Sequence, residues 1–153
     1  MFTISHRTRG CVMLSLQEMS DRFELQDLTN RYCHLLDQGL FEELRQVFTD
    51  DACIDYTAMG GIKGNPDDVV SFLKQVMPRF ANYQHMITNQ QFDIDDDKAA
   101  GRIMCLNPME PVSTSQDSSL FFLGFWYVDE YVRTDHGWRI SSRVEEKSYQ
   151  FNR

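Results

Sequence analysis

Two segments typical of β-strands, at about 83–95 and 98–106, flank an acidic turn formed by Asp95–Asp97. The region reads YQHMITNQQFDIDDDKAAG, so it also places one histidine near the start of the first strand. Two more strands are predicted at about 119–134 and 137–149. Strands that follow one another along a chain pair as an antiparallel sheet, and such a sheet needs at least one covered face. The first half of the chain has to supply that cover.

Three helices are predicted in this first half. The first begins at Ser20 or Asp21, carries apolar residues at helical spacing and stops at Gly39. A short second helix is predicted over 41–48. A third is predicted over 65–80, because its start reads Asn-Pro-Asp-Asp, which supplies a cap, a proline for the first turn and two acids. Helices first and strands afterwards indicate the α+β class.

The length and composition predict one domain. The chain of 153 residues is long enough for a full hydrophobic core, and we expect this domain to cover 19–153. Residues 1–18 lack clear periodicity and are expected to form a flexible arm. A short strand is predicted at 52–56, and a loop at 107–118 separates the two pairs of long strands.

The charge and cysteine patterns exclude several functions. The formal net charge is −8 and no basic cluster is present, so nucleic acid and anionic membranes are not expected as partners. No run of 18 apolar residues predicts a membrane span. The four cysteines have neither metal-ligand nor redox spacing, so we expect reduced structural thiols in a cytoplasmic protein and no metal site.

Three phrases carry a resemblance to a known family. They are LQDLTNRYCHLLDQGLFEELRQVFTDDACIDY, YQHMITNQQFDIDDDKAAGR and WYVDEYVRTDHGWRISSR. In this order they resemble the nuclear transport factor 2-like superfamily, and within it the SnoaL-like group. The resemblance implies a cone-shaped α+β roll in which three N-terminal helices pack on a strongly curved antiparallel sheet.

The resemblance also implies a set of site residues. The spacing of Tyr32 and Asp37, followed by His85, looks like the bile-acid dehydratase and scytalone dehydratase branch. In such enzymes the tyrosine binds a substrate oxygen, while the aspartate polarises a histidine that removes a proton beside a carbonyl. An arginine on the last strand of the bile-acid enzymes is matched best by Arg143. Scytalone dehydratase has its aspartate directly after the tyrosine, where this chain has Cys33, so only the bile-acid-like arrangement fits.

The residues alone leave alternatives open. A lone strand histidine such as His85 also fits a structural role, and Tyr32 also fits a core position. Asp37 lies off the apolar stripe of its helix, where periodicity predicts a solvated acid. Arg143 alternates with Ile140 along the last strand, so it reaches the same face only if a bulge intervenes. Without a bulge it is a surface residue or an ion-pair partner.

Two functions of different kinds follow. The first is a cofactor-independent acid–base enzyme, a dehydratase or isomerase, acting on a mid-sized cyclic or steroid-like carbonyl compound. Tyr56 and Trp126 are further candidates for contacts with such a substrate. The second is a noncatalytic domain, either a ligand carrier or a structural subunit resembling the small subunit of ring-hydroxylating dioxygenases. In both cases large apolar side chains on the sheet predict a homodimer or homotrimer.

Overall fold

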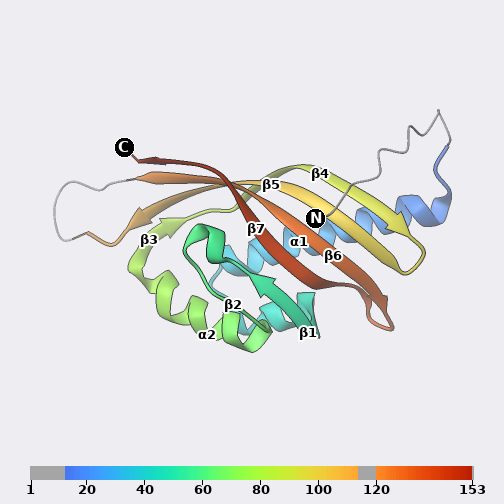
Figure 1. Ribbon diagram of the computed structural model, residues 1–153, viewed down its shortest axis with the longest axis horizontal. Coiled ribbons are helices and arrows are strands. Elements are labelled where there is room, and N and C mark those ends of the chain that lie inside the picture. Colours follow the sequence, from blue (N-terminus) through green and yellow to red (C-terminus); the bar gives the residue numbers. More distant parts are fainter. Residues whose placement is uncertain (1–12, 114–119, 153) are drawn as a thin grey trace.

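The computed structural model describes residues 13–113 and 120–152 of the chain (Figure 1). The helices are α1 (Leu16–Asp37), α2 (Pro66–Val76) and the 3₁₀ helices η1 (Phe41–Val47), η2 (Thr57–Met59) and η3 (Met77–Arg79). The strands are β1 (Phe48–Asp55), β2 (Lys63–Gly64), β3 (Phe80–Tyr83), β4 (Met86–Asp95), β5 (Lys98–Pro111), β6 (Phe121–Thr134) and β7 (Gly137–Asn152).

Helix α1 begins earlier than the sequence predicted. Its cap is Ser15, whose hydroxyl accepts a hydrogen bond from the backbone of Glu18 at 3.1 Å. The prediction at Ser20 was wrong because the first turn is solvated and shows no apolar periodicity; the side chain of Leu16 is 83% exposed. The predicted stop is confirmed, since Gly39 takes a left-handed φ of +69° just after the helix. The rest of the expected arm, residues 1–12, lies outside the described residues.

Helix α2 has the predicted start and a shorter end. Asn65 caps the helix, and its side chain and that of Asp68 form a reciprocal capping box. The helix ends at Val76 and passes into η3, because Pro78 lacks the N–H needed to continue the helix.

Over the described residues the sheet has seven strands in the order β2-β1-β7-β6-β5-β3, with β4 also paired to β5. Among these strands every pairing is antiparallel except that of β1 with β7, which is parallel. The sheet is therefore mixed rather than antiparallel throughout. Figure 1 shows its long strands curving over α1, with α2 beside β1 and β2. The predicted α+β arrangement of three helices, α1, η1 and α2, on a curved sheet is confirmed.

Two bulges shape the pairing of β6 with β7. One lies between Gly124 and Phe125 and the other between Glu130 and Tyr131. Glu130 pairs with Ser142 and Tyr131 with Ile140, which leaves the residue between them without a partner. Bulges bend and twist a strand locally, and one extra residue reverses the alternation of side chains beyond it. The bulge required to bring Arg143 to the inner face is therefore present.

A break between β3 and β4 replaces the single strand predicted over 83–95. Both strands pair with β5: Tyr83 lies opposite Met109, and Met86 lies opposite Leu106. The two residues between them, Gln84 and His85, belong to neither strand. Strand β5 itself runs to Pro111, although a loop was predicted from residue 107; the later part of that loop, 114–119, lies outside the described residues. The break therefore places His85 beside Asn107 and Pro108, in the last third of β5.

Candidate active site

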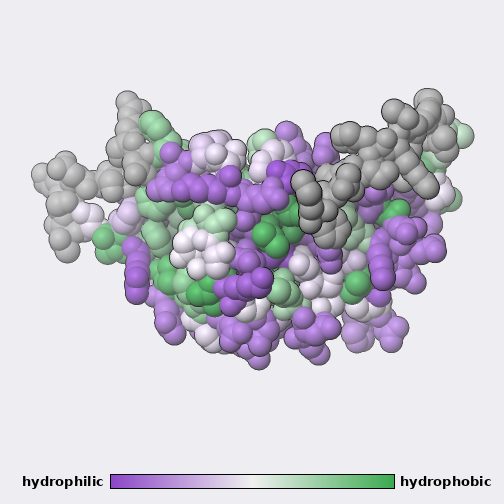
Figure 2. Space-filling model, viewed as in Figure 1, coloured by the Kyte–Doolittle hydropathy of each residue, from purple (hydrophilic) through white to green (hydrophobic). Residues whose placement is uncertain are grey.

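A cavity of about 280 Å³ lies between the helices and the inner face of the sheet. Most of its wall is apolar and aromatic, and six side chains with polar tips interrupt that lining: Tyr32, Tyr56, His85, Asn107, Glu145 and Gln150. The elements that contribute to the wall meet between the C-terminal end of β7 and α2 in Figure 1. Figure 2 shows hydrophobic residues gathered on that part of the surface. An apolar cavity with a few convergent polar groups is the usual form of a small-molecule site.

His85 and Asp37 form a close pair on this wall. The imidazole Nδ1 lies 2.7 Å from Oδ1 of Asp37, and the backbone N–H of His85 donates to both carboxylate oxygens at 3.1 Å. Asp37 is the last residue of α1, so the helix end meets the break between β3 and β4. The His85 side chain is only 8% exposed. The carboxylate thus fixes both the position and the tautomer of the imidazole.

Asn107 holds the other nitrogen of this ring. The Asn107 amide is fully paired when its Nδ2 donates to the carbonyls of Gln84 and Pro108, at 3.1 and 3.2 Å. Its Oδ1 then accepts from Nε2 of His85 at 3.0 Å. In this orientation both ring nitrogens donate, which is the form the imidazole has after taking up a proton. The opposite amide orientation pairs Nδ2 with an unprotonated Nε2, so Asn107 can pair with either state of the ring.

Tyr32 and Tyr56 bring their hydroxyl groups together at the cavity. The two oxygens share one hydrogen bond, so the hydroxyl that accepts keeps its own hydrogen for a further partner. Burial raises the pKa of both phenols well above the usual value for tyrosine, which keeps them neutral donors at neutral pH. Both residues were predicted from the sequence as substrate contacts, and both line the cavity.

Arg143 lies behind this tyrosine pair. It is fully buried, and its guanidinium carbon lies 4.0 Å from the ring centre of Tyr32 and 4.1 Å from that of Tyr127. Two hydrogen bonds of 2.8 and 2.6 Å join it to the buried Asp129. Of the two alternatives for Arg143, the surface position is wrong and the ion pair is correct. Among the described residues, Arg143 does not line the cavity. It packs against the ring of Tyr32 on the side away from the cavity and holds that ring in place.

Trp126 lies on the other face of the sheet. The side chains of β6 that line the cavity are Phe121, Leu123 and Phe125, and alternation sends Trp126 outward. There it stacks with Arg102, whose guanidinium carbon lies 4.6 Å from the ring centre. The prediction of Trp126 as a substrate contact is wrong for this cavity.

Glu145 and Asn107 are polar cavity residues that the sequence did not identify. Burial raises the pKa of Glu145 to about 8, although the charge of Arg143 lowers it and Asp129 and Asp55 raise it. The bulge at Ser141 in β7 hides the inward position of Glu145 from simple alternation. Asn107 was assigned to a loop because Pro108 follows it. The alternation of Ile103, Cys105 and Asn107 was the available signal.

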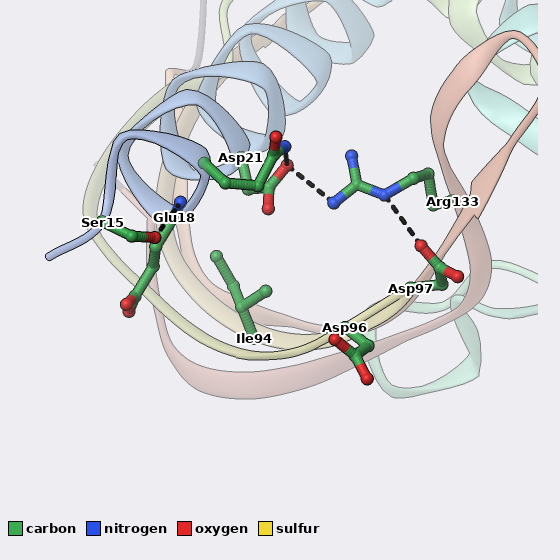
Figure 3. A pocket seen from close by; sticks show the side chains of 8 residues that line it. Ser15, Glu18, Asp21, Ile94, Asp96, Asp97 and Arg133 are labelled. Carbon is green, nitrogen blue, oxygen red and sulfur yellow. Dashed lines mark hydrogen bonds and ion pairs between the residues drawn. The ribbon is translucent and has the colours of Figure 1, made fainter.

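A second hollow, of about 630 Å³, lies where the start of α1 meets the turns after β4 and β6 (Figure 3). Arg133 bridges it by donating to Asp21 at 2.7 Å and to Asp97 at 3.0 Å. Burial opposes ionisation of Asp21, but hydrogen bonds from Arg133, Gln17 and Trp138 hold its pKa below the usual value. Asp21, predicted as a helix cap, therefore anchors α1 to the sheet.

Neither a metal cluster nor a membrane helix is found where the structure is described. Over residues 13–113 and 120–152, no three His, Cys, Asp or Glu side chains are placed to hold a metal ion. Over the same ranges no helix is both long and apolar enough to cross a bilayer.

Comparison with known proteins places this fold and cavity in a family. Residues 17–144 match the model of the SnoaL-like domain, and the chain belongs to that family. An uncharacterized protein of Mycobacterium tuberculosis strain H37Rv is 45% identical over 138 residues, which cover 90% of this chain and 92% of the relative.

Solved structures show the same fold. A protein from Kribbella flavida has a TM-score of 0.78 at 28% identity, over 87% of this chain and 94% of its own. A structure of LinA has a TM-score of 0.76 at 25% identity, over 88% and 90% of the two chains. LinA is a hexachlorocyclohexane dehydrochlorinase.

Proposed function

We propose that this protein is a cofactor-independent lyase that removes a proton beside a carbonyl group and expels a neighbouring group. The observation that carries the proposal is the His85–Asp37 pair, at 2.7 Å, in the wall of an apolar cavity. Had the imidazole been packed against backbone away from the cavity, a carrier or a structural subunit would have been the better choice. LinA, which shares the fold, also carries out an elimination, as its name states.

Each polar group has a task in such a reaction. His85 takes the proton at Nε2 after the substrate displaces the Asn107 amide from that nitrogen, while the carboxylate of Asp37 stabilises the imidazolium that forms. Asn107 then accepts the new N–H, as it does in the orientation that satisfies its amide. The free hydroxyl hydrogen of the Tyr32–Tyr56 pair donates to the carbonyl oxygen as negative charge develops there. The apolar wall favours a mid-sized cyclic substrate and keeps water away from the reacting atoms.

Replacing Asp37 by Asn tests the pair. The variant keeps an acceptor for the imidazole but loses the negative charge. A hydrogen bond to a charged group contributes about 1.5–3 kcal/mol, so turnover is expected to fall about ten- to a hundredfold. The assay uses a panel of cyclic β-hydroxy ketones, from 3-hydroxycyclohexanone to steroid-sized compounds, and follows the absorbance of the conjugated enone. Asp51→Asn, which changes an exposed aspartate of β1, is the matched control and should keep full activity.

The panel also distinguishes the two kinds of function. Tight binding of these ketones by the unmodified protein without any loss of water would favour the noncatalytic ligand carrier. An Asp37→Asn variant as active as Asp51→Asn would show that the pair has no part in the reaction.

We also infer that the protein associates with copies of itself through the outer face of the sheet. Half-exposed apolar side chains cover this face on neighbouring strands, namely Met104, Leu106, Phe122, Trp126, Val128 and the more exposed Val144. An apolar surface that spans several strands is typical of a protein interface.

A lysine on this face is expected to break the assembly. Met104 lies opposite Trp126 near the centre of the outer face, so Met104→Lys would bury a charge between subunits. The unmodified protein should elute as a dimer or trimer in size-exclusion chromatography with light scattering, and Met104→Lys should elute as a smaller species. Gln75→Lys, on the exposed side of α2, should elute like the unmodified protein. A monomeric unmodified protein would exclude this interface.

A further inference from the structure

Glu145 is a cavity carboxyl group that the His85–Asp37 pair leaves without a role. It projects from β7 opposite Tyr127 of β6, and the residue is only 8% exposed. Over residues 13–113 and 120–152, no hydrogen bond to its carboxyl oxygens is found, and these oxygens are not among the fully buried polar atoms that lack a partner. They are therefore open to the cavity rather than sealed in the core. Since Glu145 lines the cavity, a bound molecule can supply the missing partner.

The charges around Glu145 favour its neutral form. Arg143 is the cation whose charge acts on Glu145. Its Nε and Nη2 are bonded to Asp129, whereas its Nη1 has no hydrogen-bond partner in the described part of the chain. Asp129 and Asp55 both oppose a further negative charge at this place, and burial acts in the same direction. Tyr32 and Tyr56, which face the same space from α1 and from the end of β1, are neutral. At neutral pH the carboxyl group therefore holds a proton that it can donate.

We propose that Glu145 is the general acid of the elimination, the group that protonates the departing hydroxyl of the substrate. This role rests on the lyase function proposed above and specifies its leaving group. Glu145 is on β7, while Asn107, which holds His85, is on β5. Strand β6 lies between them, so two strand spacings, about 10 Å, separate the two strands, and the register adds four residues, about 13 Å, along them. The side chains of Glu145 and Asn107 both reach into the cavity that lies between these positions. A cyclic substrate between them can be contacted from both sides.

The step balances in protons and electrons. His85 takes the proton from the carbon beside the carbonyl, and the electrons of that C–H bond form the new C=C bond. The C–O bond to the hydroxyl breaks, and the departing oxygen takes the proton of Glu145 and leaves as water. Glu145 is then a carboxylate and His85 an imidazolium, and transfer of one proton from the ring to the carboxylate through water restores both groups.

This acid matters only for certain leaving groups. Hydroxide is a poor leaving group and needs a proton, whereas a halide or an acetate leaves as a stable anion. The site is therefore suited to β-hydroxy carbonyl compounds, the class of substrate that loses water. A dehydrochlorination, the reaction named in the description of LinA, needs no general acid because chloride leaves as an anion.

The test compares two leaving groups in one protein. Glu145→Gln keeps the size and polarity of the side chain but has no acidic proton. With 3-hydroxycyclohexanone the variant should lose at least about a hundredfold in turnover, the usual contribution of one general acid. With 3-acetoxycyclohexanone it should keep turnover close to that of the unmodified protein. The difference between the losses of turnover on the two compounds, rather than either loss alone, measures the contribution of Glu145 as a general acid.

The outcomes are distinct. Equal losses on both compounds would overturn the role of Glu145 as an acid and leave the elimination standing, and so would full activity on both. Failure of the unmodified protein to act on either compound would overturn the elimination and this role together. A variant that does not fold, recognised by its circular dichroism, is replaced by Glu145→Asp, which keeps the acid and should keep the preference for the hydroxyl compound at reduced turnover. Loss of that preference in Glu145→Asp would overturn the role.

A measurement of stability checks the protonated carboxyl group independently of activity. Since folding raises the pKa of Glu145 from 4.5 to about 8, the folded protein binds the proton more tightly than the unfolded chain does. The stabilisation is complete below pH 4.5 and is lost as the pH rises through about 8. The melting temperature of the unmodified protein should therefore fall from pH 5 to pH 9 relative to that of Glu145→Gln. If the melting temperatures of the two proteins change in parallel with pH, the inference that Glu145 is neutral in the folded protein is overturned.

Discussion

His85→Ala is expected to lower turnover at least about a hundredfold while the protein keeps its fold. General acid–base catalysis by one positioned side chain contributes on the order of 10²–10⁴ in rate, and here the imidazole is the base that takes the substrate proton. The fold should survive because His85 belongs to neither β3 nor β4, so the ladders with β5 remain intact. The measurement is turnover of the cyclic β-hydroxy ketones described above, alongside the circular dichroism of the variant.

Two other histidines serve as controls for this substitution. His34 on the solvent side of α1 and His136 in the turn before β7 are exposed, and alanine at either place should leave turnover unchanged. If His85→Ala keeps near-full activity, another group in the cavity is the base. If His85→Ala unfolds the protein, the histidine has the structural role that its sequence context also allowed.

Arg143→Met is expected to cause the largest loss of stability. The ion pair with Asp129 is fully buried, so removing the cation leaves a carboxylate in the core whose remaining donor is Tyr131, at 2.7 Å. Breaking such a pair from one side typically costs about 3–5 kcal/mol. The free energy of unfolding, measured by urea denaturation, should fall by this amount. A loss below about 1 kcal/mol would mean that the carboxylate of Asp129 is hydrated by water or neutralised by a proton in the variant.

Two further variants separate charge from packing. Arg102→Met removes a half-buried arginine that pairs with the exposed Glu146 at 2.6 Å on the outer face, and such surface pairs are worth about 1 kcal/mol or less. The double variant Arg143→Met with Asp129→Leu removes both buried charges and should recover much of the stability lost by Arg143→Met alone. A double variant less stable than the single one would show that the pair is net stabilising in this core.

Local features of the fold could be predicted from the sequence because their causes lie within a few residues. Gly39 ends α1 by its own backbone freedom, and the capping box at Asn65 needs only the residues that follow it. The turn at Asp95–Asp97 is equally local. The parallel pairing of β1 with β7 was missed, because it joins segments far apart in the chain and no local pattern marks it.

Tyr32, Asp37 and His85 of the candidate site were predicted from the family resemblance and not from local sequence patterns. Helical periodicity placed Asp37 in solvent, but its partner is a strand junction at the helix end rather than the core stripe. Glu145 could not be found from alternation along β7, since the bulge at Ser141 reverses the face of the residues that follow it, Glu145 included. Trp126 was assigned by its aromatic character alone, and its place in the alternation of β6 sends it outward.

The parallel pairing of β1 with β7 bears on how the site assembles during synthesis. Ile54 of β1 lies beside Arg143, so Tyr56, two residues further on, takes its place only against a strand near the end of the chain. A ribosome therefore has to release almost the whole protein before the tyrosine pair can meet the rest of the cavity. Contacts of such long sequence separation slow folding. Until they form, the early helices have their apolar faces uncovered, which makes this interval the one in which a chaperone would be of most use to the chain.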